Sequence, residues 1–444
     1  MQARTTWLVL SLSAVLAAPA TAQITSGTAP GTFTGPSSSQ TPYVIPSISG
    51  WNTLSLISVA DAAKDDGYVM VGIPDGLGAV GGRFRGGRYV DKDDYMTVFM
   101  NHELTGPSGI ARAHGQTGAF VSEWTIRLST LQVRHGEDLI QKLYTWDTAT
   151  GQYLLANGTL AAQLSRLCSA DLPAYSAFYN RRTGKGFNGR LFMNGEENGS
   201  EGRGWAHVLT GDSKGSSYQL PYLGRMSWEN SVASPNSGDK TIVIALEDGT
   251  PGQVYVYVGD KKKAGNPIER AGLSGGSLLG ISVTNGGANY ADGPVAHENN
   301  GALNGTFVLA NVSAAALGTG AALQTLSVAQ HVTEFARPED GAWDTLDPRV
   351  FYFVTTGARI DGQDQPSKLY KLTFDSITNP TGASGVTALE AADCGPLPPP
   401  LVARTLNVYV LPAVKPATVV LVASGEPVTV LGVCAVVPMY GVTS

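Results

Sequence analysis

Short apolar or alternating runs recur along the middle of the chain. They are rich in Val, Tyr, Phe and Thr and are bounded by Gly, Asn and Asp, a composition typical of β-strands. The clearest runs cover residues 95–103, 122–129, 190–197, 241–248, 253–259, 305–312, 350–357 and 368–375. This pattern predicts an all-β fold.

Several of these runs form pairs with a common layout, in which a strand ends in polar residues and a Gly-rich turn leads to an alternating strand. The pairs are YMTVFMNHE with SEWTIRLS, GRLFMNGEE with GWAHVLT, TIVIALED with QVYVYVG, and VFYFVTTG with SKLYKLTF. Their irregular spacing indicates a degenerate repeat with loop insertions. Radial repetition of small antiparallel sheets buries many short strands without long exposed edges, so we predict a β-propeller of about six blades. A β-sandwich or two stacked barrels is the alternative, because strand spacing does not count blades.

Composition and charge narrow the class further. Gly accounts for 54 of the 444 residues, which is well above the usual share of about 7% and disfavours a helical bundle. The formal net charge is -6, and no basic cluster is larger than Lys261–Lys263, so a nucleic-acid partner is not expected.

The two ends of the chain differ from its middle. Residues 1–22 have the layout of a signal peptide, which predicts a secreted or periplasmic protein, and residues 23–50 form an extended lead-in. We expect the propeller to cover residues 51–390. Residues 391–444 form an atypical apolar tail, interrupted by Pro and Lys and therefore unsuited to a membrane span; it is either a last blade or an out-of-frame sequence.

Cysteine usage indicates no disulfide framework, because Cys168, Cys394 and Cys434 are an odd number without paired spacing. One bridge between two of them is possible and none is required. Cys168 has no His near it in sequence, and no Gly-x-Ser-x-Gly motif stands out, so covalent catalysis is not favoured.

Acidic residues recur where the first strand of a predicted pair ends. Glu103 ends the first, Glu196 and Glu197 end the second, and Glu247 and Asp248 end the third. In a propeller such ends surround one mouth of the central channel, where carboxylates persist together only if they are protonated, paired or bound to cations. Oxygen ligands suit calcium, magnesium, manganese or ferric iron. The alternative is that each acid lies on a solvated turn.

Arg337 and Glu339 lie two positions apart in an extended stretch and so face the same side. They could share one ligand, with the guanidinium binding an anion such as phosphate and the carboxylate binding a metal. A structural ion pair between two blades is equally consistent with this spacing. His102 is expected to be structural, and residues 76–81 (GLGAVG), which lack a strand-to-helix context, are expected to form a flexible loop.

The stretches FMNHE, MNGEENGSEGR, SWENSVASP and FARPEDGAWD followed by FYFVTTG resemble the PhoX-type alkaline phosphatases. The resemblance runs in pieces from about residue 60 to 375, and the Arg-Pro-Glu motif is its most specific part. It implies an elaborated six-bladed propeller, export from a bacterial cell, and a calcium and ferric-iron site that hydrolyses phosphate monoesters. By motif, Glu196 or Glu197 and Glu339 would be metal ligands and Arg337 would hold the phosphate, with Asn101 and Glu103 close by.

One feature of the resembling enzymes is absent from the expected place. They use a Cys thiolate at the iron site shortly after the first strand motif, and residues 104–109 hold none. We therefore expect Ca²⁺, and leave Fe³⁺ open.

The predicted function is that of a monomeric, secreted metal-dependent phosphoesterase that acts on a small phosphate ester. Its metal ligands would be Glu103, Glu196, Glu197 and Glu339; Arg337 and Glu339 would be catalytic, and Arg337 and Asn101 would bind substrate. Two alternatives stay open, a non-catalytic calcium-binding propeller and a lactonase-like propeller hydrolase.

Overall fold

The computed structural model describes residues 23–47, 50–378, 380 and 384–389, and within them all of the predicted strands are present. The four predicted pairs are antiparallel neighbours. They are β7 (Tyr95–His102) with β8 (Phe120–Arg127), β15 (Leu191–Glu196) with β16 (Gly204–Val208), β19 (Lys240–Glu247) with β20 (Gly252–Asp260), and β25 (Val350–Thr355) with β28 (Lys368–Thr373). The all-β prediction is confirmed.

Two sheets are built on the first two pairs. The first has the order β4-β7-β8-β9, and the second has the order β11-β10-β17-β16-β15-β12. Their further strands are β4 (Pro74–Gly81), β9 (Gln132–Asp138), β10 (Lys142–Asp147), β11 (Gln152–Leu155), β12 (Leu167–Asp171) and β17 (Ser216–Gln219).

A ten-stranded sheet contains the other two pairs and runs in the order β18-β19-β20-β21-β22-β29-β28-β25-β24, with β23 paired to β20. Its two halves join where β22 pairs with β29, and its end strands β18 and β24 lie against each other, so the sheet nearly closes on itself. Its further strands are β18 (Trp228–Ala233), β21 (Ser277–Asn285), β22 (Asn304–Asn311), β23 (Glu334–Phe335), β24 (Pro338–Trp343) and β29 (Ser384–Leu389).

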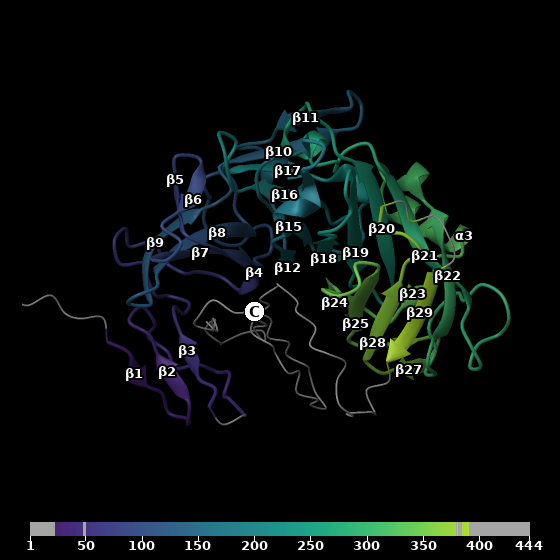
Figure 1. The fold of residues 1–444 in the computed structure, drawn as a ribbon, viewed down its shortest axis with the longest axis horizontal. Helices are drawn as coiled ribbons and strands as arrows, with labels where there is room; N and C mark the ends of the chain where they lie inside the picture. Colours follow the sequence, from purple (N-terminus) through teal and green to yellow (C-terminus); the bar gives the residue numbers. More distant parts are fainter. Residues whose placement is uncertain (1–22, 48–49, 379, 381–383, 390–444) are drawn as a thin grey trace, which may run out of the picture.

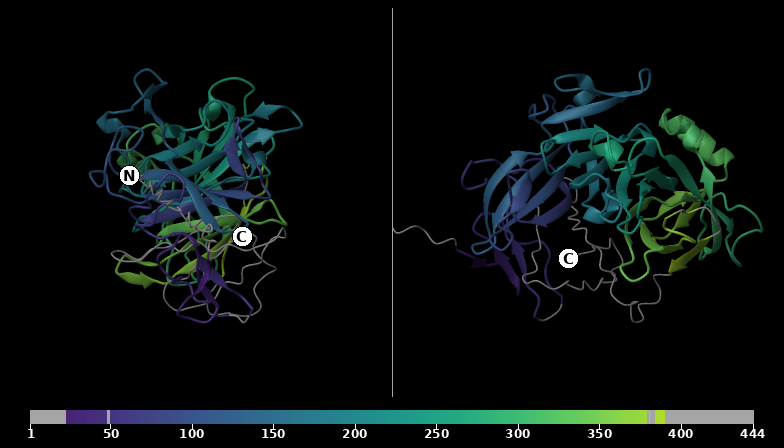
Figure 2. Two further views of the ribbon diagram at one scale, coloured as in Figure 1. Left: turned by 90° about the vertical axis from the view of Figure 1, so that its left-hand side faces the viewer. Right: turned by 45° about the horizontal axis from the view of Figure 1, so that its top comes forward.

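The strands β4, β12, β18 and β24 are called the innermost strands here, because they follow one another around a common centre. β12 lies against both β4 and β18, and β18 lies against β24. Figure 1 and Figure 2 show the other strands of each sheet extending outward from this arc, as in the blades of a propeller. The structure supports a β-propeller-like architecture, and the number of six blades stays a prediction.

Apolar side chains fill the spaces between and within these sheets. Phe99 and Phe192 pack in the cluster between the first two sheets, and Met193 and Trp228 pack between the second and third. Inside the ten-stranded sheet a third cluster is centred on aromatic residues such as Tyr370. Face-to-face packing of neighbouring sheets is how propeller blades bury their apolar faces.

Short strands and helices make up the rest of the described secondary structure. The remaining strands are β1 (Thr25–Ser26), β2 (Thr32–Thr34), β3 (Thr53–Ser55), β5 (Arg83–Arg85), β6 (Arg88–Val90), β13 (Tyr179–Asn180), β14 (Lys185–Gly186), β26 (Ala358–Ile360) and β27 (Gln363–Gln365). The helices are α1 (Tyr175–Phe178), α2 (Pro267–Arg270), α3 (Gly320–Ala329) and the 3₁₀ turns η1 (Leu160–Ala162), η2 (Pro221–Leu223) and η3 (Ser313–Ala315).

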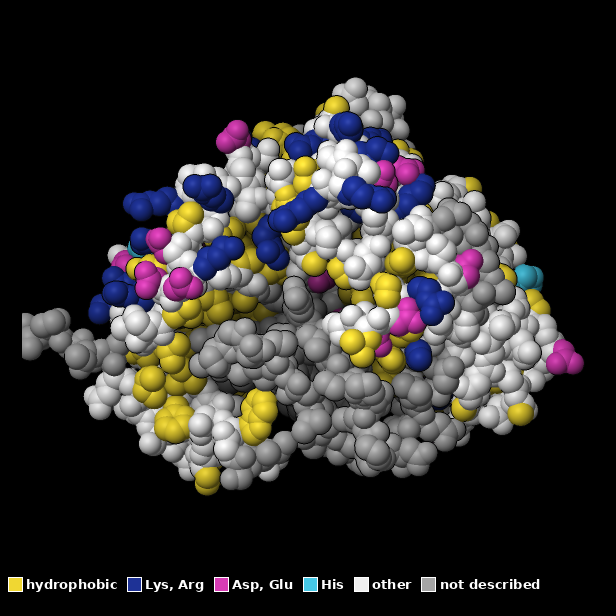
Figure 3. All heavy atoms as spheres, viewed as in Figure 1, with side chains coloured by type: hydrophobic (Ala, Val, Ile, Leu, Met, Phe, Trp, Pro, Cys, Tyr) yellow, Lys and Arg dark blue, Asp and Glu magenta, His cyan; other side chains and the backbone are white. Residues whose placement is uncertain are grey.

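Among the described helices, none is long and apolar enough to cross a membrane. In Figure 3, Lys and Arg side chains gather over the upper half of the face shown.

The expectation that residues 76–81 form a flexible loop is wrong, because they belong to β4. The glycines serve close packing: a Cβ at Gly76 would meet Ala170 N at 2.5 Å, and one at Gly78 would meet Leu172 Cβ at 2.7 Å. β12 therefore approaches β4 more closely than side chains would allow. The predicted signal peptide at 1–22 and the apolar tail at 391–444 lie outside the described residues, and so do Cys394 and Cys434.

Candidate metal centre

The second residue of each innermost strand carries a side chain that can bind a cation. These residues are Asp75 in β4, Cys168 in β12, Glu229 in β18 and Glu339 in β24. Because the innermost strands lie side by side, the repeat of one position in four strands gathers these groups at the centre of the arc. Propeller geometry thus brings together residues that are far apart in sequence.

A β-bulge next to this position recurs in all four innermost strands. The pairing register shifts between Pro74 and Leu77, between Leu167 and Ala170, between Trp228 and Asn230, and between Pro338 and Gly341. A bulge inserts an extra residue and redirects the neighbouring side chains. The repeated bulge is therefore the local feature that orients these four metal-ligand side chains.

A second set of polar side chains follows the ends of the neighbouring strands. β7, β15, β19 and β25 each end opposite the first residue of an innermost strand. The next residue along the chain is Glu103, Glu197, Asp248 or Thr356, respectively. Both sets of positions lie at the same end of the blades. Three of the four strand-end residues are the acids that the sequence pattern singled out.

Two groups of potential metal ligands result. The thiol cluster consists of Glu103, Cys168 and Glu197, and the carboxylate cluster consists of Glu229, Asp248 and Glu339; within each, one ligand atom per residue lies within 4.8 Å of the others. The clusters adjoin, because Glu229 Oε1 accepts hydrogen bonds from Ser169 Oγ at 2.6 Å and Cys168 Sγ at 3.5 Å.

One arginine accompanies each cluster. Arg166 Nε and Nη2 donate to Glu103 Oε1 at 2.9 and 2.7 Å, and Nη2 also contacts Glu197 Oε2 at 2.7 Å. Arg337 donates to both oxygens of Asp248 at 2.8 and 2.7 Å and contacts Glu339 Oε1 at 3.1 Å. The two arginine side chains are 42% and 39% exposed, whereas these four carboxylates are 6–14% exposed. Each guanidinium thus covers a nearly buried acidic group.

Burial and mutual repulsion raise the pKa values of several central acids. The pKa of Asp75 is raised well above its ordinary value, first by burial and then by the nearby Glu103. Burial raises the pKa of Glu197 to about 7, against the opposing effect of Arg166. The pKa values of Glu229 and Glu339 are also raised, mainly by burial and by their proximity to other carboxylates. The positive charges of the protein are therefore too few to neutralise the carboxylates of this centre.

The donor chemistry of the two clusters fits cations. Three carboxylates, as in Glu229, Asp248 and Glu339, are ligands for a hard ion such as calcium. A thiolate beside two carboxylates, as in the thiol cluster, suits a softer or more strongly acidic metal such as iron. The thiol of this cluster does not follow the first strand motif, because Cys168 reaches the cluster from β12.

The structure separates the two alternatives Glu196 and Glu197. Glu197 joins the thiol cluster, whereas Glu196 pairs with Arg203 at 2.5 Å and accepts a hydrogen bond from the backbone N–H of Ser165. Consecutive residues of an extended strand point to opposite sides, so only one of the pair can face the centre. Of the other predicted ligands, Glu103 lies in the thiol cluster and Glu339 lies in the carboxylate cluster with Arg337 beside it.

Asn101 lies behind the site and is fully buried. Its side-chain amide donates to the carbonyls of Cys168 at 2.6 Å and Ser169 at 3.2 Å. Its Oδ1 accepts from Asn194 at 2.8 Å, and Asn194 Oδ1 is 2.9 Å from His207 Nε2. This chain of hydrogen bonds fixes the bulge that presents Cys168.

His102 is buried, as expected of a structural histidine. Its ring nitrogens contact the carbonyl of Val71 and Ser122 Oγ. Burial lowers the pKa of His102 to about 3, so the ring is neutral at physiological pH. It is absent from both clusters.

Sequence reasoning missed several members of the centre. Asp75, Cys168 and Arg166 were not singled out as site residues, although each occupies a position equivalent to one that was examined around Arg337 and Glu339. An arginine precedes the donor by two places in β12 and β24, as Arg166 precedes Cys168 and Arg337 precedes Glu339, so this shared spacing marks Cys168 as the counterpart of Glu339.

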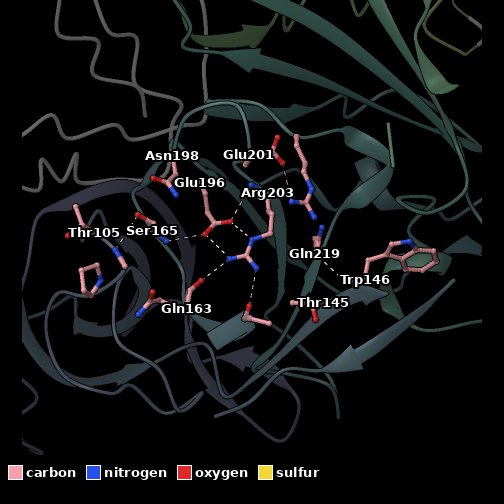
Figure 4. Close-up of a pocket in the computed structure, with 14 residues that line it drawn as sticks. Thr105, Thr145, Trp146, Gln163, Ser165, Glu196, Asn198, Glu201, Arg203 and Gln219 are labelled. Atoms are coloured by element: carbon pink, nitrogen blue, oxygen red, sulfur yellow. Dashed lines mark hydrogen bonds and ion pairs between the residues drawn. The ribbon is translucent and has the colours of Figure 1, made fainter. Parts of the chain in front are cut away.

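A polar pocket of about 700 Å³ is lined in part by residues that are close in sequence to the thiol cluster. Figure 4 shows Glu196 and Arg203 joined at its centre, with Ser165 and Asn198 along one side. Ser165 directly precedes Arg166, and Glu196 and Asn198 flank Glu197. The pocket and the thiol cluster therefore share two backbone segments.

The chain matches no protein-family model and no curated protein. Among solved structures it is similar to PhoX of Pseudomonas fluorescens, determined in complex with vanadate, a transition-state analogue. The TM-score is 0.53 with 13% sequence identity, over 77% of this chain and 73% of that chain. At this identity the similarity shows the fold, and the predicted resemblance is confirmed to that extent.

Proposed function

We propose that this protein is a metal-dependent phosphoesterase that hydrolyses phosphate monoesters at the paired clusters. The observation that carries the proposal is the repeat of one arrangement: two adjoining groups of three metal-ligand side chains, each with a half-exposed arginine. The fold similarity to PhoX is consistent with this activity. Export to the periplasm or the exterior, predicted from residues 1–22, belongs to the same proposal.

The two arginines would hold the phosphate. Within the described residues, the Nη1 group of Arg166 and that of Arg337 have no hydrogen-bond partner, while Nε and Nη2 of each are engaged by carboxylates. Those carboxylates fix the plane of each guanidinium, which leaves its outer edge as a preorganised donor. A phosphate between the two edges would gain stabilisation as negative charge grows on its oxygens.

Glu103, Cys168 and Glu197 would hold one cation, iron being the candidate, and Glu229, Asp248 and Glu339 would hold calcium. When bound, such cations polarise the phosphoryl group and neutralise its charge. Asp75, whose pKa is affected by carboxylates of both clusters, would add a further oxygen ligand at the centre. In the overall reaction water supplies a hydroxyl to phosphorus, the phosphorus to ester-oxygen bond breaks, and the alcohol leaves with a proton.

Chelation and reconstitution test the proposal. Protein purified without a chelator should hydrolyse 4-nitrophenyl phosphate, lose this activity in EDTA, and regain it with calcium, with or without added iron. Glu339→Gln removes one anionic ligand at nearly constant shape and should abolish turnover. Glu137→Gln, which changes an exposed glutamate, is the matched control and should retain activity.

Other results would contradict the phosphoesterase assignment. If calcium raises the melting temperature while no ester is hydrolysed, the clusters serve a non-catalytic calcium-binding propeller. If a lactone is hydrolysed with one bound calcium while phosphate esters are not, the lactonase-like alternative replaces it. Elemental analysis of the purified protein, carried out beside the assays, distinguishes one metal from two.

A further inference from the structure

The polar pocket has no part in the metal chemistry described above. Its wall includes Ser165, Glu196 and Asn198, whose immediate sequence neighbours are Arg166 and Glu197 of the site. Glu196 Oε1 accepts a hydrogen bond from the N–H of Ser165, and the N–H of Glu197 donates to the carbonyl of Arg166. The two backbone segments are thus fastened together, and they carry lining residues of the pocket next in sequence to residues of the metal site.

The charges in the pocket cancel. Its ionisable lining residues are Glu196, Glu201, Arg203 and Arg225, two of each sign. Glu196 and Arg203 form a close ion pair at 2.5 Å, and Glu201 and Arg225 form a looser one at 3.4 Å. A pocket without net charge gives no preference to an ionic ligand, so its ligand should be neutral.

The remaining lining is rich in groups that both donate and accept hydrogen bonds. Amides and hydroxyls are contributed by Gln163, Gln219, Asn198, Thr145, Ser165 and Thr105, as Figure 4 shows. The half-buried ring of Trp146 adds an apolar wall, held edge-on by Tyr153 and Tyr222. Dense mixed polar groups beside one aromatic ring match a molecule with many hydroxyls on an apolar carbon frame. The volume of about 700 Å³ is large enough for one or two sugar rings.

We infer that this pocket binds the neutral, polyhydroxylated part of the substrate, so that the natural ester is a phosphorylated sugar or polyol. The inference rests on the proposed function, because the phosphoryl group is assigned to the two clusters. Exposed Asn198 and the 39% exposed side chain of Arg225 are suitable probes, since neither supports the core. Binding energy from this non-reacting part would raise kcat/KM for sugar phosphates over simple aryl phosphates.

The experiment compares two substrates in three variants. Asn198→Ala and Arg225→Ala should each lower kcat/KM for glucose 6-phosphate about tenfold, the effect of one lost polar contact, while kcat/KM for 4-nitrophenyl phosphate changes less than twofold. Arg349→Ala, which truncates an exposed arginine in another blade, should alter neither. Equal loss for both substrates, or no loss for either, would overturn the inference and leave the phosphoesterase proposal intact.

A binding measurement separates this inference from the activity. Calorimetric titration with free glucose should show binding to the unaltered protein and weaker binding to Asn198→Ala and Arg225→Ala. If glucose binds in this way but no phosphate ester is hydrolysed, the pocket is a sugar site. The claim that this sugar belongs to a phosphate ester substrate is then refuted. If glucose does not bind and the two substrates are hydrolysed with similar kcat/KM, the pocket assignment is refuted alone.

Discussion

Arg166 and Arg337 occupy the same place in two different blades. Each is the residue directly before an innermost strand, and each contacts two carboxylates of its cluster. The backbone of both is left-handed, with φ of 48° at Arg166 and 64° at Arg337. A non-glycine residue in this region costs roughly 1–2 kcal/mol. Ion pairing holds both arginines in this conformation, and strain of this kind is concentrated at functional sites. The equivalence indicates that the two arginine positions have the same local structure.

The first prediction concerns these two arginines. Arg166→Lys and Arg337→Lys keep the positive charge but lose the planar fork, so each should lower kcat/KM for 4-nitrophenyl phosphate by about 100-fold, the usual effect of removing one transition-state donor. Inhibition by vanadate should weaken in parallel. Arg359→Lys, at a 67% exposed arginine, is the control.

A purely structural role for the arginines predicts a different outcome. In that case the lysine variants would have a lower melting temperature, while vanadate would inhibit the folded fraction with an unchanged constant. Such a result would remove both arginines from the phosphate site.

The second prediction concerns Cys168, the only sulfur ligand in the two clusters of the described region. Cys168→Ser replaces a soft thiolate with a hydroxyl, so the purified variant should lose iron while it retains calcium at the carboxylate cluster. Elemental analysis measures the content of both metals. Visible absorption from the thiolate-to-iron transition reports the loss of iron separately. Unchanged iron content would place the iron elsewhere, and loss of both metals together with a lower melting temperature would indicate a misfolded centre.

The strand ends of the site could be predicted from the sequence because they follow strongly alternating apolar runs. Glu103, Glu197 and Asp248 each come directly after a long strand that is easily recognised. The choice between Glu196 and Glu197 could not be made in this way. It depends on which side of the strand faces the centre, and hence on the register set by the bulge in β12.

The innermost strands were harder to recognise. Their sequences are PDGLGAVG, LCSAD, WENSVA and PEDGAW, which contain Gly, Pro and acidic residues in place of β-branched alternation. Strands that are packed on both sides and carry the site have no solvent face, so they lack the period of two that marks an ordinary strand. For this reason Asp75 and Cys168 were missed although their blades were predicted.

The third prediction tests the close approach of β4 and β12. Gly76→Ala would place a Cβ 2.5 Å from the backbone nitrogen of Ala170, so it should destabilise the fold by about 1–3 kcal/mol and disturb the nearby Asp75. Gly81→Ala in the same strand is the control, because its Cβ would meet nothing closer than the Lys92 side chain at 3.6 Å. Urea unfolding of both variants measures the difference. Equal stabilities would show that the two strands can separate without cost.

The fourth prediction concerns Asp171, which is buried at the end of β12 and accepts a hydrogen bond from the N–H of Ala233 at 2.9 Å. Burial, with a smaller contribution from Asp340, raises the pKa of Asp171 to about 7. In the unfolded chain this carboxyl loses its proton near its ordinary pKa of about 4. Between these two values the unfolded state is ionised while the folded state keeps its proton, so stability falls as the pH rises from about 4 to about 7 and then levels off.

Asp171→Asn should remove this pH-dependent cost, since the amide stays neutral and its Oδ1 can still accept from Ala233. The variant should therefore be more stable than the original protein at pH 8, by up to about 4 kcal/mol for three pKa units, and should differ little from it at pH 4.5. Urea unfolding at both pH values gives the difference directly, and other titrating acids cancel in the comparison. A gain of equal size at both pH values would mean that packing, and not the charge of Asp171, accounts for the change.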